Sequence, residues 1–177
     1  MIESSAEHNT RLTRTWIYLA LLIFIVGLTI FPFLGLQDFN TKGEPREAVV
    51  ASTMLETGNW ILPRNNGGET AYKPPMLHWC VATLSAPLGK VSEYTARIPS
   101  AAAATVLALM TFLFFAKRSD VQQGFWASLI FLTTFEVHRA AATCRVDMLL
   151  TLFIVGALFQ LYQWYECDMK GVPLLAI

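Results

Sequence analysis

Charged side chains are scarce in this chain of 177 residues, in which Asp, Glu, Lys and Arg make up only 15%. Soluble domains carry about 25% charged residues, whereas this chain is 54% apolar with a mean hydropathy of +0.45. The 13 basic and 13 acidic residues cancel, so no net charge indicates nucleic acid as a partner. Three cysteines are too few for a disulfide scaffold, and 12% aromatic residues exclude a disordered chain. The composition therefore predicts an integral membrane protein.

Uncharged stretches of the chain mark the predicted membrane spans. The first is a run of 23 residues, 15–37, and an apolar helix of about 20 residues crosses the hydrocarbon core. A cleaved signal peptide is the alternative for this run, but its apolar core would have about 7–15 residues. We predict an all-α polytopic membrane protein with about four transmembrane helices. The predicted spans are about 15–37, 98–116, 121–140 and 148–165.

The basic residues that flank these spans predict the orientation. Cytoplasmic loops carry an excess of Lys and Arg. A cytoplasmic N-terminus places five such residues inside, namely Arg11, Arg14, Lys117, Arg118 and Lys170. The long first loop, 37–97, then lies on the outer side of the membrane. The apolar tail, 172–177, resembles the start of a further span, so we expect the N-terminal part of a longer chain.

The outer loop carries much of the polar chemistry. It holds 12 of the 26 charges, six of each sign, and contains helix signals that favour a folded loop. Gly43 to Ala48 reads as a helix start, with an amphipathic helix following over 48–55, and 76–89 is an apolar run too short to span. The helix over 48–55 is predicted to lie on the membrane surface, and 76–89 is predicted to be interfacial or re-entrant. Arg97 is predicted to end the loop.

The histidines and the charged residues 139–147 before the last predicted span have structural interpretations as well as functional ones. His78 and His138 lack a second ligand at metal spacing, so interfacial packing is predicted for both, with His78 half-buried. Arg145 and Asp147 lie where charge is expensive unless it pairs or meets a polar cavity. Capping of a helix is the alternative for Asp147, and contact with headgroups is the alternative for Arg139 and Arg145.

Five short motifs, in this order, resemble the GT-C superfamily of polyprenyl-phosphate-dependent glycosyltransferases, in particular the lipid A aminoarabinose transferase-like family, which is related to protein mannosyltransferases. The motifs are GEPR at 43–46, MLETGNWILP at 54–63, YKPP at 72–75, ARIPS at 96–100 and RVDMLL at 145–150. The resemblance covers about residues 15–165. It implies a polyprenyl-phosphate sugar as donor, a lipid or glycan acceptor such as lipid A, membrane lipids as surroundings, and no nucleic acid.

The resemblance also implies roles for the acidic residues that match the family's motifs. Glu44 is the candidate catalytic carboxylate, because the Asp-Glu pair of the family is Gly43-Glu44 here, and Asp38 is a substitute acid. Asp147 matches the acid that opens the fourth span and is the second candidate catalytic residue. A helix-start acid without chemistry is the alternative for Glu44.

Four cations are candidates for binding the donor phosphate, whose negative charge grows as the glycosidic bond breaks. Lys73 and Arg46 match family residues, and Arg64 and Arg145 are further candidates. Interfacial anchoring is the alternative for Lys73 and Arg46, and a structural role is the alternative for Arg64. Tyr72 stands where many relatives have a metal-contacting Glu, so no residue is assigned to a metal and a divalent cation is left open as cofactor.

Two functions of other classes compete with the transferase. In a transporter piece, Arg139, Arg145 and Asp147 would line a polar pathway, but transport sites lie near the bilayer midplane, where these spans are almost free of charge. A non-catalytic membrane scaffold is the second alternative, because Gly43 and Tyr72 depart from the family pattern.

Overall fold

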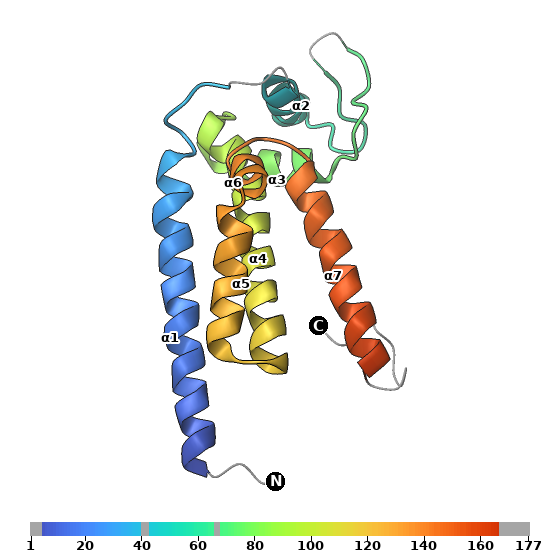
Figure 1. Ribbon diagram of the computed structural model, residues 1–177. Helices are drawn as coiled ribbons and strands as arrows, with labels where there is room; N and C mark the ends of the chain where they lie inside the picture. Colours follow the sequence, from blue (N-terminus) through green and yellow to red (C-terminus); the bar gives the residue numbers. More distant parts are fainter. Residues whose placement is uncertain (1–4, 40–42, 66–67, 167–177) are drawn as a thin grey trace.

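The computed structural model describes residues 5–39, 43–65 and 68–166, and in these ranges the protein is helical (Figure 1). The helices are α1 (Ser5–Thr29), η1 (Phe31–Phe33), α2 (Gly43–Thr57), α3 (Met76–Ser85), η2 (Ala86–Leu88), α4 (Glu93–Arg118), α5 (Val121–Thr133), α6 (Phe135–Ala141) and α7 (Asp147–Glu166). The described part contains no strand, and only an isolated antiparallel bridge joins Arg64 to Thr70. The prediction of an all-α membrane protein is confirmed.

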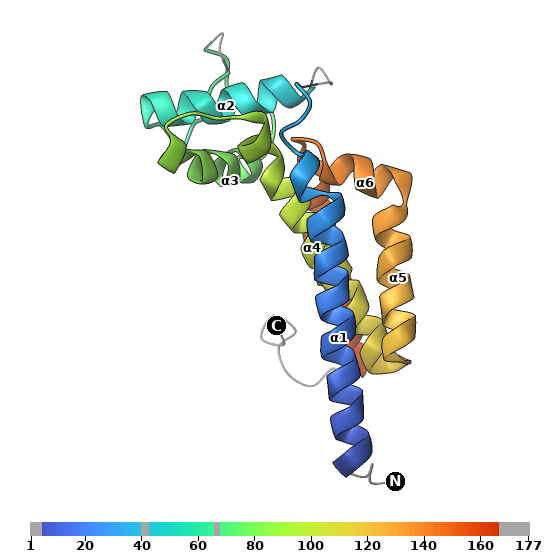
Figure 2. The ribbon, with the colours of Figure 1, turned by 90° about the vertical axis from the view of Figure 1, so that its left-hand side faces the viewer.

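Three helical segments are long and apolar enough to cross a membrane, and they agree with the first, second and fourth predicted spans. They run over Asn9–Phe33, Glu93–Arg118 and Asp147–Glu166. The predicted third span, 121–140, is not one helix. At Thr134 the backbone leaves the helical region, with φ −61° and ψ 125°, and α6 turns aside from α5 (Figure 2). The 13 residues of α5 measure about 20 Å, too short for the hydrocarbon core.

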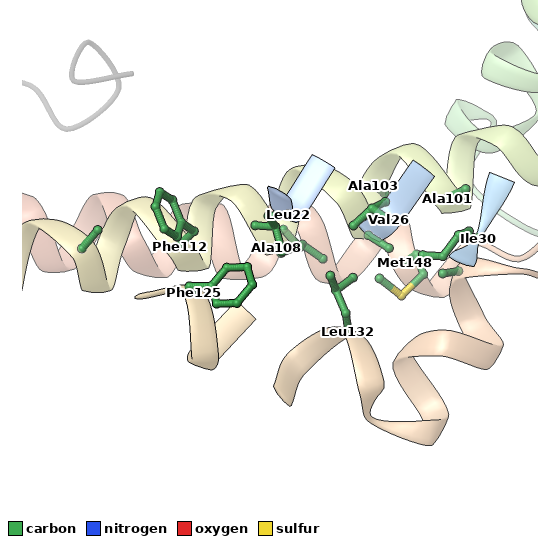
Figure 3. Packing of buried hydrophobic residues seen from close by; sticks show 14 of the residues in the cluster. Leu22, Val26, Ile30, Ala101, Ala103, Ala108, Phe112, Phe125, Leu132 and Met148 are labelled. Atoms are coloured by element: carbon green, nitrogen blue, oxygen red, sulfur yellow. The ribbon is translucent and has the colours of Figure 1, made fainter. Parts of the chain in front are cut away.

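The first hydrophobic core lies between the long helices, around α4 (Figure 3). Small residues on α4, such as Ala104 and Ala108, are fully buried and let neighbouring helices approach closely. At Gly124 of α5 the two helices lie so close that an added Cβ atom would lie 2.6 Å from the Phe112 carbonyl oxygen of α4. The hydroxyl of Ser128 donates to the Ala108 carbonyl oxygen at 2.8 Å. Close packing thus fixes α5 against α4 despite its short length.

A second core lies beyond one end of the long helices, where α2 and α3 run across them (Figure 2). We call α2, the hairpin arms 63–65 and 68–71, and α3 the cap. The buried side chains of this second core include Met54 of α2, Val81 of α3 and Cys144 of the loop between α6 and α7. The predicted helix start at Gly43 to Ala48 and the predicted surface helix over 48–55 form one helix, α2, which begins at Gly43 and buries Glu44 and Glu47 in its first turns.

Helix α4 begins before its apolar run. Ser92 caps it, accepting from the Thr95 backbone N–H at 3.2 Å, while the Thr95 hydroxyl accepts from the Ser92 backbone N–H at 3.0 Å. This capping box starts the helix at Glu93. Arg97 therefore does not end the loop, as the sequence predicted, but lies inside α4 and is 3% exposed.

The end of the bundle opposite the cap carries the flanking basic residues. Arg11 of α1 donates to the Ala116 carbonyl oxygen of α4 at 3.1 Å. Arg118 pairs with Glu166 of α7 and lies over the rings of Phe114 and Tyr162. The ends of α1, α4 and α7 that carry these residues lie on one side (Figure 1). Lys170 and the tail, 172–177, are outside the described residues.

Candidate active site

Helix α2 carries two buried glutamates, Glu44 and Glu47, with exposed fractions of 1% and 3%. They lie about one turn apart and point to different partners. Burying a carboxylate is costly unless charged or hydrogen-bonding groups compensate it. The groups that compensate the charge of each glutamate therefore indicate the role of that glutamate in the cap.

Glu44 is held by a residue that the sequence analysis did not assign to the site. Its Oε1 accepts from Arg97 Nε at 3.0 Å and from the Cys144 backbone N–H at 2.9 Å. The other guanidinium nitrogens of Arg97 donate to backbone carbonyl oxygens of the segment after α1. These acceptors are Leu34 and Gln37 at 2.7 Å and Asp38 at 3.0 Å. Arg97 thus joins α4, α2, the segment after α1 and the α6–α7 loop at one point.

Glu47 gathers three donors, and we call Glu47, Lys73, His78 and Arg46 the Glu47 cluster. Oε1 of Glu47 lies 3.0 Å from Lys73 Nζ and 3.3 Å from Arg46 Nη2. Oε2 lies 2.8 Å from Nε2 of His78, which is fully buried rather than half-buried as predicted. His78 therefore anchors the acid from inside the cap, while Lys73 and Arg46 reach it from the surface.

The donors change the acidity of Glu47. Burial raises the pKa of its carboxyl, but the hydrogen bonds from His78 and Lys73 and the positive charge of Lys73 outweigh burial and lower the pKa from 4.5 to about 2. A carboxylate with such a pKa is a weak base, so proton abstraction is not its natural role. Its charge instead holds Lys73 and Arg46 together.

The two cations of this cluster face a small opening of the cap. A pocket of about 10 Å³, roughly the room of one water molecule, lies against Arg46, Glu47 and Lys73 on one side and Asn65 and Thr70 of the hairpin on the other. The side chains of Arg46 and Lys73 are 46% and 27% exposed. An anion larger than water would therefore meet them at the mouth of this pocket.

The other residues predicted for the site have their partners outside the Glu47 cluster. Asp147 opens α7 and pairs with Arg145 at 3.0 Å, with the Asp147 side chain 53% exposed. Arg64 is exposed on the hairpin, where its Nη1 donates to the Gly68 carbonyl oxygen at 3.2 Å. Asp38 is exposed and contributes its backbone carbonyl oxygen to Arg97. Cys144 and Val146 pack in the second core, so the segment carrying Arg145 and Asp147 borders the cap.

The chemistry of the cluster does not suit a divalent metal. The carboxylate of Glu47 is already bound by the cations Lys73 and Arg46, which would repel a metal ion. Tyr72, at the position of the metal-contacting acid in relatives, directs its hydroxyl to Glu69 at 3.3 Å. No group of three His, Cys, Asp or Glu side chains with metal-binding geometry occurs within residues 5–39, 43–65 and 68–166. We derive no reaction step through a metal.

Glu47, His78 and Arg97 were not among the site residues predicted from the sequence. A signal for Glu47 was available, because it lies on the same short motif as Glu44 and Arg46. The signal for Arg97 was its place in an otherwise apolar helix, where an unpaired charge would be expensive. Neither signal identifies the partner, because the partners lie far away in sequence.

Comparison with known proteins shows the family of the chain. The chain is 30% identical over 135 residues to the undecaprenyl phosphate-alpha-4-amino-4-deoxy-L-arabinose arabinosyl transferase of Shewanella sediminis, and this alignment covers 76% of the chain and 24% of the relative. This chain belongs to the aminoarabinose transferase-like family. The enzyme of the same name from Pseudomonas savastanoi pv. phaseolicola is also 30% identical over 135 residues, with 76% of the chain and 25% of the relative covered.

Further members of the aminoarabinose transferase-like family are similar over comparable stretches. The enzyme of the same name from Aeromonas hydrophila is 28% identical over 144 residues, which cover 81% of the chain and 26% of the relative. The chain thus spans about a quarter of the length of the curated relatives it matches. No family model matches the chain. No solved structure matches it either.

Proposed function

We propose that the protein acts in a membrane glycosyltransferase that moves a sugar from a polyprenyl-phosphate donor to a lipid or glycan acceptor, such as lipid A. The relatives are named for an undecaprenyl-phosphate aminoarabinose donor, and this supports a donor of the same class. We place the protein in the bacterial inner membrane, with a cytoplasmic N-terminus and the cap on the periplasmic side. The basic residues at the end opposite the cap support this orientation.

The single observation that carries the proposal is the pair of cations on Glu47. Lys73 and Arg46 converge on one carboxylate oxygen, at 3.0 and 3.3 Å, at the surface of the cap. Each has further N–H donors that this oxygen does not use. We assign these donors to the phosphate of the donor lipid, with Arg46 suited to two parallel hydrogen bonds and Lys73 acting as a point charge.

The reaction needs positive charge at this place. As the bond between the anomeric carbon and the phosphate oxygen breaks, the phosphate keeps the electron pair and gains negative charge. An oxygen of the acceptor forms the new bond to that carbon, and its proton, if it carries one, passes to a base or to solvent. Fixed cations that meet the growing charge typically contribute about 100-fold or more to the rate.

The acidic residues divide by exposure. Glu44 is 1% exposed and bound to Arg97 and the Cys144 N–H. In this proposal Glu44 holds the cap on the bundle, so we assign it a positioning role in place of the predicted catalytic role. Asp147 is exposed at the start of α7, beside Arg145, and we assign it to orienting or deprotonating the acceptor. Asp38 is kept as a substitute acid. Arg145, which borders the cap, and Arg64, which lies on its hairpin, are assigned to secondary contacts with the lipid phosphates.

A groove along the bundle suits the isoprenoid chain of the donor. A cavity of about 520 Å³ begins at Trp79 and Cys80 of α3 and runs between α4 and α7. A second cavity of about 680 Å³ continues from it along the same two helices toward Lys117, and both are lined by Val106 and Leu152. The walls are mainly apolar, as a polyprenyl chain requires. The groove begins beneath the cap, so a chain in it would carry its phosphate toward the cap.

The proposal is tested by transfer assays on membranes that contain the full-length protein. The donor is radiolabelled undecaprenyl-phosphate aminoarabinose. Lys73→Ala is expected to lower kcat/KM for the donor about 100-fold. Lys90→Ala is the matched control, because Lys90 is exposed on the turn before α4, and its activity should stay within twofold of wild type. Equal activity of both variants would show that the donor phosphate binds elsewhere.

A further inference from the structure

The Glu47 cluster contains a group that phosphate binding alone does not call for. Glu47 places a full negative charge at 3.0 Å from Lys73 Nζ and 3.3 Å from Arg46 Nη2, the same atoms that would meet the donor phosphate. A fixed acid beside two cations weakens the binding of every anion. It does not weaken all anions equally, because the repulsion grows with the charge of the ligand.

We propose that Glu47 sets the ionic preference of this site, holding its net charge at +1 so that the doubly charged polyprenyl-phosphate product is not retained in place of the singly charged donor. The inference rests on the proposed function and concerns the same site. It makes Glu47 a specificity-determining residue that acts through Lys73 and Arg46.

The charges of donor and product differ because of the reaction. The donor is a phosphodiester, with one negative charge. When the bond from the anomeric carbon to the phosphate oxygen breaks, the phosphate keeps the electron pair and becomes a monoester, while the acceptor oxygen takes the sugar. A phosphate monoester has a second ionisation near pH 6, so the product carries close to two charges at pH 8. A site of net charge +2 would hold that product strongly.

The geometry of His78 fixes the charge of the cluster. Its Nε2 meets Glu47 at 2.8 Å, and its Nδ1 is buried without a hydrogen-bond partner among the described residues. A protonated ring would place an unmatched N–H at Nδ1, so the neutral ring, which donates from Nε2, fits the site. Lys73 and Arg46 then contribute two positive charges and Glu47 one negative charge.

Neighbouring groups leave this sum unchanged. Glu44 and Arg97 pair with each other at 3.0 Å and cancel. The Cys144 thiol, whose pKa is raised to about 12 by burial and by the nearby glutamates, stays neutral. Glu69, which accepts from Tyr72, is exposed on the hairpin and is screened by solvent. The pocket beside the cluster has a volume of about 10 Å³, so a neutralising ion has little room inside it.

The size of the effect follows from Coulomb's law. With an effective dielectric constant of about 45, between the values for a protein surface and for water, removing one charge about 8 Å from a phosphate at the edge of the protein changes the affinity of the phosphate about fivefold. The interaction energy is proportional to the charge of the ligand, so a doubly charged ligand gains the square of that factor, about 25-fold. Charge removal therefore changes the ratio of the two affinities, which a loss of shape alone would not do.

The experiment measures binding of farnesyl phosphate and of its methyl ester, a phosphodiester, to the wild-type protein in lipid nanodiscs by tryptophan fluorescence. Glu47→Gln is compared with Glu56→Gln, which removes an exposed acid from the same helix, at pH 5 and pH 8. Glu47→Gln should tighten the diester about fivefold at both pH values, and the monoester about fivefold at pH 5 and about 25-fold at pH 8. Glu56→Gln should change neither ligand by more than about twofold.

A second variant tests the inference if Glu47→Gln does not fold. Arg46→Gln lowers the net charge to zero at a half-exposed side chain, so it should weaken the monoester about fivefold more than the diester at pH 8, and both equally at pH 5. If both ligands change by equal factors at pH 8, or if Glu47→Gln weakens them, the inference is wrong while the phosphate site stands. A wild-type protein that binds neither ligand overturns both the proposed function and this inference.

Discussion

Replacing Arg97 of α4 by Met should destabilise the protein more than replacing any single cation of the cap or the loops. Arg97 is 3% exposed and donates to Glu44 and to three carbonyl oxygens, at distances from 2.7 to 3.0 Å. Removing one partner of a buried ion pair leaves an uncompensated charge and costs about 3–5 kcal/mol. In a chain of this size, about 1 kcal/mol lowers Tm by about 2–4 °C, so we expect a fall of about 6–20 °C.

The assay is thermal unfolding of the detergent-solubilised protein, read as the fraction that stays monodisperse after heating. Arg64→Met is the matched control, because Arg64 is exposed on the hairpin and its removal should shift Tm by less than about 2 °C. The double variant Arg97→Met with Glu44→Leu removes both charges and should lose less stability than the sum of the single losses. A single variant with wild-type Tm, or strict additivity in the double, would refute the reasoning.

The same variants separate two roles of Glu44. Glu44→Gln keeps an oxygen that can accept from the Cys144 N–H but leaves Arg97 without its counter-charge. We expect it to lower Tm together with transfer, because the residue positions the cap. Loss of transfer at an unchanged Tm would instead support the catalytic role that the family resemblance implies for this residue.

Three further outcomes are expected. Gly124→Ala should lower Tm by several degrees, because its Cβ atom would lie 2.6 Å from a backbone oxygen of α4, whereas Gly27→Ala, with open space around it, should not lower it. The pKa of Glu47 is lowered to about 2, so its contribution of about 3 kcal/mol is present above about pH 4.5 and lost as pH falls toward 2. The Tm advantage of wild type over Glu47→Gln should shrink over that window, and an advantage independent of pH would contradict this. Cys144, fully buried with a pKa raised to about 12 by burial, should react with maleimide at pH 8 only after unfolding, and labelling of Cys144 itself in the native protein would contradict its burial.

Much of the architecture could be predicted from the sequence because membrane crossing is a local property. A long apolar run must form a helix in lipid, where no water satisfies the backbone. The runs 15–37, 98–116 and 148–165 met that condition. The second and third lie wholly, and the first mostly, in helical segments long enough to span. The helix signals of the outer loop were also local, and α2 and α3 lie where 48–55 and 76–89 placed them.

The break between α5 and α6 shows where local reasoning ended. The residues 121–140 carry enough apolar side chains for a span, but α5 ends at Thr133 and α6 holds the exposed Glu136 and Arg139, which pair with each other at 2.6 Å. A pair of neighbouring charges is satisfied at the edge of a membrane and not inside it. The sequence holds both facts, and only the packed structure decides between them.

The sequence by itself determined that this chain is a helical membrane protein with a charged loop, because hydropathy and charge act along the chain. Only the tertiary structure decided which charges meet. Glu44 bonds to Arg97 across 53 residues and to Cys144 across 100. Glu47 bonds to His78 across 31. A buried charge must find a partner, but the partner is set by how the cap folds onto α4 and the α6–α7 loop, and that depends on the packing of the whole chain.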